Sequence, residues 1–137
     1  MFAQLDTKSV YSFMDSVVDL NSYVARAKEL GYQALGLMDR DNLYAAYHFA
    51  QLASRNGLRP LIGMEANLFY EGRKIPFRLL AKNNQGYKNL MKLATELSSG
   101  QREFTAFSDY LNDIALILPS EDWEPGMTLG SEVFIGV

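Results

Sequence analysis

The stretch LGLMDRDNL, residues 35–43, decides the fold of this 137-residue chain. An apolar run over residues 34–38 leads into an Asp-Arg-Asp-Asn turn, and a helical pattern follows directly. A short apolar run that ends in a polar turn is typical of a parallel strand covered on both faces. The stretch therefore predicts a buried strand that passes through a polar turn into a helix.

The flanking sequence continues this alternation of strands and helices. Glu71 and Gly72 favour a hairpin turn between two of the strands. The βαβαβ order predicts an α/β fold with a mostly parallel sheet. Further strands are expected at residues 2–6, 61–70, 74–81, 114–118 and 132–137, and helices from the N-cap Asn21 to Leu30, from Asp41 or Asn42 to Asn56, and after Gly86.

Two acidic side chains fall near the ends of consecutive strands in this pattern. Asp39 closes the strand at residues 34–38, and Glu65 follows one βα unit later. In α/β folds, ligands and catalytic groups gather at the C-terminal edge of parallel strands. We therefore expect the functional edge of the sheet at Asp39 and Glu65.

The composition narrows the function classes. A net charge of −3 and a pI near 5.1 argue against an autonomous nucleic-acid binder, although a larger nucleic-acid enzyme can carry its basic channel elsewhere. The absence of cysteine excludes disulfides and thiolate metal sites, and it fits a reducing cytoplasm. No apolar run approaches the ~20 residues of a membrane-spanning helix. His48, the only histidine, is expected on or against a helix rather than in a catalytic triad.

Four stretches together resemble the PHP (polymerase and histidinol phosphatase) domain, in the form found at the N-terminus of bacterial DNA polymerase III alpha subunits. They are KELG at residues 28–31, LMDRDNL at 37–43, LRPLIGME at 58–65 and LLAKNNQGYKNL at 79–90, of which the last is the most specific. The resemblance covers residues 2–98. It implies that residues 1–137 form the N-terminal part of a partial, distorted (β/α)7 barrel, with the remaining strands and the polymerase domains outside this chain.

The metal-binding form of this family carries three histidines that this chain lacks. The resemblance places Asp6 and Lys8 at its His-x-His pair, and Arg40 at its histidine after Asp39. Lysine and arginine are cationic and cannot coordinate a metal ion under ordinary conditions. The exchanges predict a degenerate site that holds no metal and no catalytic residue.

The carboxylates of that site are retained according to the same resemblance, with Asp15 and Glu65 at ligand positions. We hypothesise that Lys8 and Arg40 replace the metal ions electrostatically and hold the carboxylates in a salt-bridged cluster. The alternative is a solvated loop rim whose charged groups make no mutual contact. The expected degenerate positions are Asp6, Lys8, Asp15, Asp39, Arg40 and Glu65.

The turn before the last of these helices admits two interpretations. Gly86 lies at the start of that helix, as a glycine does in a phosphate-binding turn. A single glycine is a weak signal, and a simple helix N-terminal turn is the favoured interpretation.

The resemblance assigns an activity to the parent protein rather than to this part. The parent is expected to elongate DNA from deoxynucleoside triphosphates in the bacterial cytoplasm, with Mg²⁺ at carboxylates outside this chain. This part is expected to be structural and to need no cofactor, with the other polymerase domains, replisome proteins and, through the parent, DNA as partners. Two alternatives stay open: an active metal-dependent PHP phosphoesterase or proofreading 3′–5′ exonuclease, and a non-catalytic protein-binding domain unrelated to polymerases.

Overall fold

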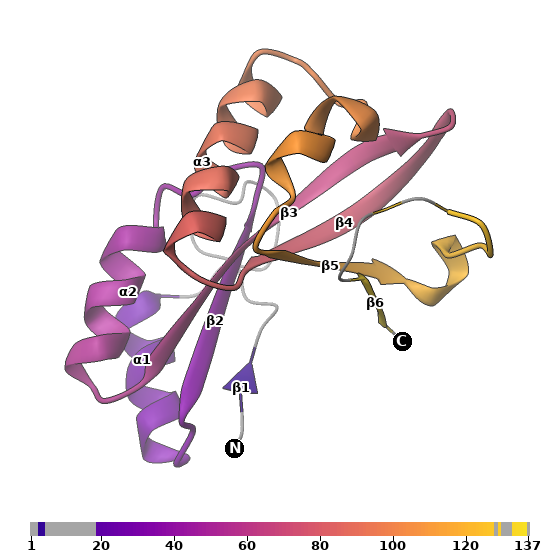
Figure 1. The fold of residues 1–137 in the computed structure, drawn as a ribbon. Coiled ribbons are helices and arrows are strands. Elements are labelled where there is room, and N and C mark those ends of the chain that lie inside the picture. Colours follow the sequence, from indigo (N-terminus) through magenta and orange to yellow (C-terminus); the bar gives the residue numbers. More distant parts are fainter. Residues whose placement is uncertain (1–2, 5–18, 128, 130–132, 137) are drawn as a thin grey trace. The chain divides into compact units, whose positions relative to one another are not determined.

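The computed structural model describes residues 3–4, 19–127, 129 and 133–136 (Figure 1). The chain divides into two compact units, residues 1–64 and residues 65–137. Strand β3 (Arg59–Tyr70) supplies the last strand of the first unit and the first strand of the second. No helix in these described ranges is both long enough and apolar enough to cross a membrane.

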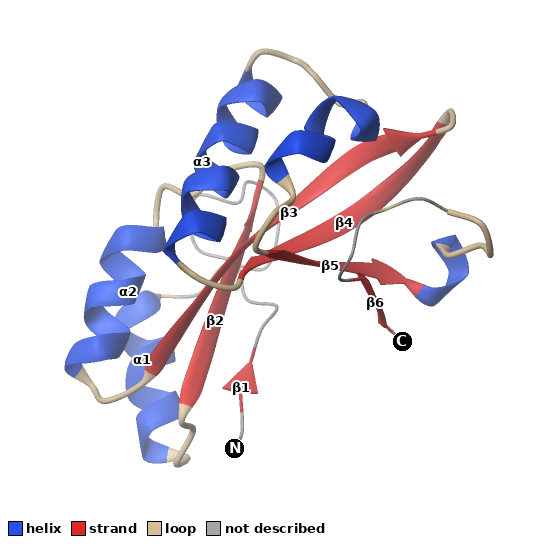
Figure 2. Cartoon of the chain, in the orientation of Figure 1, coloured by secondary structure: helices blue, strands red, loops and turns tan. Residues whose placement is uncertain are grey.

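The first unit is built on the strand order β1-β2-β3 with two helices, drawn in blue in Figure 2. Its elements before β3 are β1 (Ala3–Gln4), α1 (Leu20–Glu29), β2 (Ala34–Arg40) and α2 (Ala46–Arg55). β1 runs parallel to β2, with Ala3 opposite Ala34. β2 is buried up to Asp39, as its continuous apolar run predicts.

The core of the first unit lies between β2 and the two helices. The ring of Phe49 on α2 is fully buried and stacks on Tyr23 of α1, with 6.1 Å between the ring centroids. The hydroxyl of Tyr23 donates to the carbonyl of Gly36 at 2.7 Å, which ties α1 to β2. The other core residues are Val24, Ala27, Leu35, Leu37, Ala45, Ala53 and Leu58.

The second unit is a mixed sheet in the order β3-β4-β5-β6, with α3 packed against β4. β4 is antiparallel to β5, and β5 is parallel to β6. Glu71 and Gly72, with φ of 50° and 80°, form the two-residue turn between β3 and β4. The remaining elements are β4 (Arg73–Ala81), α3 (Asn84–Ser98), the 3₁₀ helices η1 (Phe104–Tyr110) and η2 (Ser120–Asp122), β5 (Ile114–Pro119) and β6 (Val133–Gly136).

Alternate side chains of β4 point into the core of the second unit. Ile75, Phe77 and Leu79 are fully buried, while the residues between them are only half-buried. Phe104 of η1 stacks on Phe77 with 5.0 Å between the ring centroids, and Phe107 is also fully buried. Phe104 and Phe107 of η1 therefore belong to the core.

The structure confirms the α/β class and corrects the sheet. The hairpin between β3 and β4 brings antiparallel pairing into the sheet, which is mixed rather than mostly parallel. Over the described residues the sheet is open, and no closed barrel is seen. A hairpin reverses the chain after two residues, whereas a barrel of βα units needs a crossover after each strand.

Both helix starts in the first unit differ from the sequence prediction. Asp19, not Asn21, is the N-cap of α1, and its carboxylate accepts from the backbone N–H of Asn21 at 3.3 Å. The residue at the N-cap of α2 is Ala45, which makes no side-chain cap. The side chain of Asn42 is used in the turn instead: it donates to the carbonyl of Arg40 and accepts from the N–H of Tyr44.

The Asp19 cap predicts a pH dependence of stability. The hydroxyl of Ser22 donates to the carboxylate at 2.9 Å and lowers the pKa of Asp19 below its ordinary value. A pKa that is lower in the folded than in the unfolded chain stabilises the fold above the ordinary pKa, and this contribution is lost as the pH falls through the lowered value. Wild type should therefore exceed Asp19→Asn in thermal stability at neutral pH, and the difference should begin to shrink near pH 4 and disappear as the pH falls through the lowered pKa of Asp19. A difference that does not change with pH would contradict this.

Candidate functional site

The end of β2 carries two of the six predicted site residues. The side chain of Asp39 is buried, with 2% exposed, and Arg40 is partly buried with its Nε shielded from solvent. Both make further polar interactions within the chain.

Glu65 belongs to the second unit and lies in the middle of β3 rather than at its end. The prediction of a strand end was wrong because β3 continues for five residues beyond Glu65, up to the hairpin turn. Its side chain is 8% exposed, with Oε2 shielded from solvent. A carboxylate so deeply buried needs polar partners inside the chain, and Glu65 has such an interaction.

The other three predicted positions, Asp6, Lys8 and Asp15, lie outside the described residues, and the clustering of all six stays a prediction. Across residues 19–127 and the short described segments beside them, no group of three His, Cys, Asp or Glu side chains is placed to hold a metal ion. His48 is exposed in the first turn of α2, in agreement with the expectation that it lies on or against a helix.

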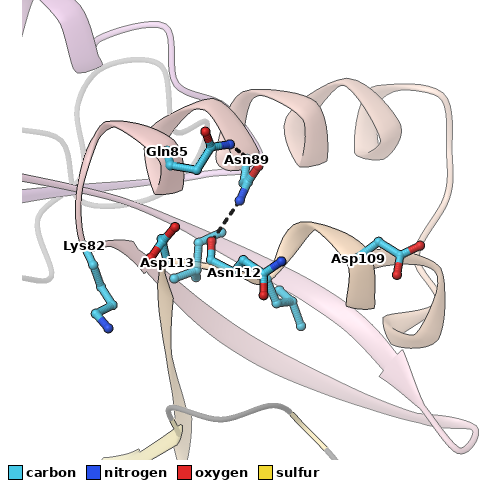
Figure 3. A pocket seen from close by; sticks show the side chains of 8 residues that line it. Lys82, Gln85, Asn89, Asp109, Asn112 and Asp113 are labelled. Atoms are coloured by element: carbon cyan, nitrogen blue, oxygen red, sulfur yellow. Dashed lines mark hydrogen bonds between the residues drawn. The ribbon is translucent and has the colours of Figure 1, made fainter.

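A polar cleft of about 680 Å³ lies in the second unit, between the start of α3 and the connection from η1 to β5 (Figure 3). Most of the side chains that line it are polar or charged, and most are exposed. The exception among the polar ones is Asn89, which is 6% exposed. The lining residues are Lys82, Gln85, Asn89, Asp109, Leu111, Asn112, Asp113 and Ile114.

The first turn of α3 is pressed against the backbone at one end of this cleft. Asn83 caps the helix by accepting from the N–H of Gly86 at 3.0 Å. A Cβ at Gly86 would overlap the carbonyl oxygen of Asp113 and would lie 3.2 Å from the Cα of Ala81. The same carbonyl accepts from the N–H of Lys82 at 2.9 Å. Close packing therefore accounts for the glycine at this position.

Asn89 ties the next turn of α3 to the same backbone. Its Nδ2 donates to the carbonyl of Asn112 at 2.8 Å, and its Oδ1 accepts from Nε2 of Gln85 at 3.2 Å, as the dashed lines in Figure 3 show. The one buried polar side chain in the lining is thus satisfied within the chain. Sequence reasoning missed this role, although asparagine inside an otherwise apolar helix face was a usable signal.

The packing at Gly86 predicts a large effect of a small substitution. Alanine normally stabilises a helix by up to about 1 kcal/mol over glycine. Here the added methyl group must displace the backbone at Asp113, so we expect Gly86→Ala to lower the free energy of unfolding by about 1–3 kcal/mol. Urea denaturation measures the free energy of unfolding. The control is Lys88→Ala at an exposed position of the same helix, which should change this free energy by no more than about 0.5 kcal/mol. A stabilised Gly86→Ala variant would contradict the contact.

The buried side-chain amide of Asn89 gives a second prediction for stability. Asn89→Ala removes the donor from the carbonyl of Asn112, and we expect a loss of about 1–3 kcal/mol in the free energy of unfolding. Gln85→Ala removes only the exposed partner of Asn89 and should cost less than about 1 kcal/mol. Equal losses in the two variants would show that the bond to Asn112 contributes little.

Comparison with known proteins finds similarity to alpha subunits of bacterial DNA polymerase III. The chain is 47% identical to DNA polymerase III subunit alpha of Streptococcus pyogenes serotype M1 over 137 residues. The aligned region makes up 100% of this chain and 13% of that protein. The chain is also 33% identical to the same subunit of Bacillus subtilis over 126 residues. This aligned region makes up 88% of this chain and 11% of that protein. This chain therefore spans only a small fraction of the length of its curated relatives.

A solved structure of an amidohydrolase from Chromobacterium violaceum shares the fold. Its sequence is 11% identical to this chain, and the two structures superpose with a TM-score of 0.61. The matched region covers 90% of this chain and 69% of the amidohydrolase chain. The family model of the PHP domain matches residues 4–124. The chain thus belongs to the PHP domain family, and it matches the N-terminal region of DNA polymerase III alpha subunits.

Proposed function

We propose that this chain is the PHP region of a bacterial replicative DNA polymerase III alpha subunit and that its role there is structural. Identity of 47% over all 137 residues to such a subunit supports the parent. The parent would elongate DNA from deoxynucleoside triphosphates in the cytoplasm, with Mg²⁺ at carboxylates outside this chain. The chain's partners would be the other polymerase domains, replisome proteins and, through the parent, DNA.

The open sheet fits a role as part of a larger body. We propose that further strands of the parent continue the sheet into a distorted (β/α)7 barrel of PHP type. The amidohydrolase structure that shares the fold supports an α/β arrangement of this kind but says nothing of its chemistry.

The observation that carries the structural role is Arg40, which follows buried Asp39 at the end of β2. A guanidinium group offers five donors and no lone pair, and it stays protonated at any working pH. It therefore cannot serve as a metal ligand in the place where the family resemblance has a histidine. Arg40 therefore does not fit a divalent metal at this strand end, and we propose that Lys8 and Arg40 balance the site carboxylates instead.

Metal content tests the proposal directly. The 137-residue protein, purified without chelator and incubated with Mn²⁺ and Zn²⁺, should hold substoichiometric metal by elemental mass spectrometry. The control is the triple variant Asp6→His/Lys8→His/Arg40→His, which restores imidazole ligands and should bind more metal than wild type.

Hydrolysis of 3′-labelled single-stranded DNA distinguishes the proposed structural role from phosphoesterase or exonuclease activity. We expect no release of nucleotides by wild type above that by Asp39→Asn. Stoichiometric metal in wild type, with hydrolysis that Asp39→Asn abolishes, would overturn the structural role and indicate a phosphoesterase or a proofreading 3′–5′ exonuclease.

A further inference from the structure

The acidic segment that follows β5 is attached to the β3–β4 hairpin by one side chain. Nη1 of Arg73 donates to Oε1 of Glu124 at 3.1 Å, and Nη2 of the same guanidinium group donates to the carbonyl of Asp122 at 2.6 Å. Residues 120–127, which we call the strap, are thereby held beside the first residue of β4. In the described part of the chain, both hydrogen bonds that join the strap to the hairpin come from Arg73.

The strap makes few interactions of its own that would keep it in place. None of residues 120–127 is buried, so the attached strap adds no side chain to the core. Two backbone hydrogen bonds close turns inside the strap, from the N–H of Trp123 to the carbonyl of Ser120 and from the N–H of Met127 to the carbonyl of Glu124. Neither of these bonds reaches the sheet. A segment with few buried apolar contacts opens locally at a lower cost than the core.

The charge of the strap calls for a cation from another element. The strap carries Glu121, Asp122 and Glu124, and no lysine or arginine follows Arg102 in the sequence. Like charges this close in the chain repel one another, so a cation beside them is favourable. The guanidinium group of Arg73 suits this position because it engages a carboxylate and a carbonyl at the same time, whereas lysine acts as a point charge.

We propose that the strap is a conformational device, which Arg73 closes onto the hairpin and which opens while the rest of the second unit stays folded. The ion pair is exposed, with 44% of the Arg73 side chain and 67% of the Glu124 side chain accessible to solvent. An ion pair at such a position stabilises weakly and is screened by salt, so the closed and open forms lie close in free energy. Ionic strength therefore sets the population of the open form.

Opening removes one wall of a small cleft at the hairpin. The cleft has a volume of about 160 Å³, and Tyr70, Glu71 and Arg73 line it from the hairpin while residues 124–127 line it from the strap. In the open form the guanidinium group of Arg73 loses both acceptors and is free to bind another carboxylate. The strap is thus a built-in acidic ligand of the hairpin. The proposal concerns the second unit alone and does not depend on the proposed function.

Trp123 reports the state of the strap, because it lies within the strap and is the only tryptophan. Acrylamide quenching of its fluorescence is measured on the 137-residue protein at about 10 mM and about 1 M NaCl, between which the Debye length falls from about 30 Å to about 3 Å. We expect the Stern–Volmer constant of wild type to rise by up to about twofold, since 41% of Trp123 is exposed in the closed form. Arg73→Gln should show the higher constant at both salt concentrations.

Two cation variants serve as matched controls. Lys74→Gln removes the exposed cation next to Arg73, and Arg26→Gln breaks an exposed ion pair with Glu29 in the first unit. Both variants should keep the quenching constants and the salt dependence of wild type. The double variant Arg73→Glu/Glu124→Arg restores an ion pair with its charges exchanged, and its quenching constant at low salt should be lower than that of Arg73→Glu.

Far-UV circular dichroism separates opening of the strap from loss of the fold. The spectrum of Arg73→Gln should match that of wild type at both salt concentrations, because the strap contains no buried residue. Three results would overturn the proposal: wild-type quenching that does not change with salt, equal quenching of Arg73→Gln and Lys74→Gln, or a rise in quenching that is accompanied by loss of the helical signal.

Discussion

The second unit depends on the close approach between the first turn of α3 and the backbone leading into β5. Gly86 has no room for a Cβ because the carbonyl of Asp113 occupies that space. The same carbonyl accepts a hydrogen bond from Lys82, so one oxygen joins the end of β4 to the start of β5. With Asn83 capping the helix and Asn89 bonding the carbonyl of Asn112, α3 can take only one position over the sheet.

This constraint explains why LLAKNNQGYKNL is so specific a stretch of sequence. Its polar residues satisfy backbone groups at the point where a strand, a helix and a second strand meet, and its apolar residues fill the core between them. Substitutions at its buried positions, such as Gly86 and Asn89, overfill a space or leave a polar group unsatisfied, whereas exposed Lys88 can be replaced at little cost. The motif therefore identifies the fold, and it says nothing about the chemistry of the site.

Prediction from sequence succeeded where one pattern dominated and failed where two groups competed for the same role. The buried strand β2 and the β3–β4 hairpin followed from periodicity and turn residues alone. The cap of α2 did not, because Asn42 forms the turn after β2 and leaves the N-cap to alanine. Asp39 and Arg40 were correctly placed at the end of β2, whereas Glu65 lies inside β3, within the strand at residues 61–70 that the sequence itself predicted.

The fold and the candidate site depend on different physical interactions. The fold rests on buried apolar side chains and backbone contacts that are indifferent to which polar group ends β2. An imidazole in place of Arg40 offers a neutral nitrogen to a metal, whereas the guanidinium brings a permanent positive charge and no lone pair. The exchange therefore alters what the strand end can bind while leaving β2 itself intact. The PHP fold and the charge of the residue that ends β2 therefore depend on separate physical requirements.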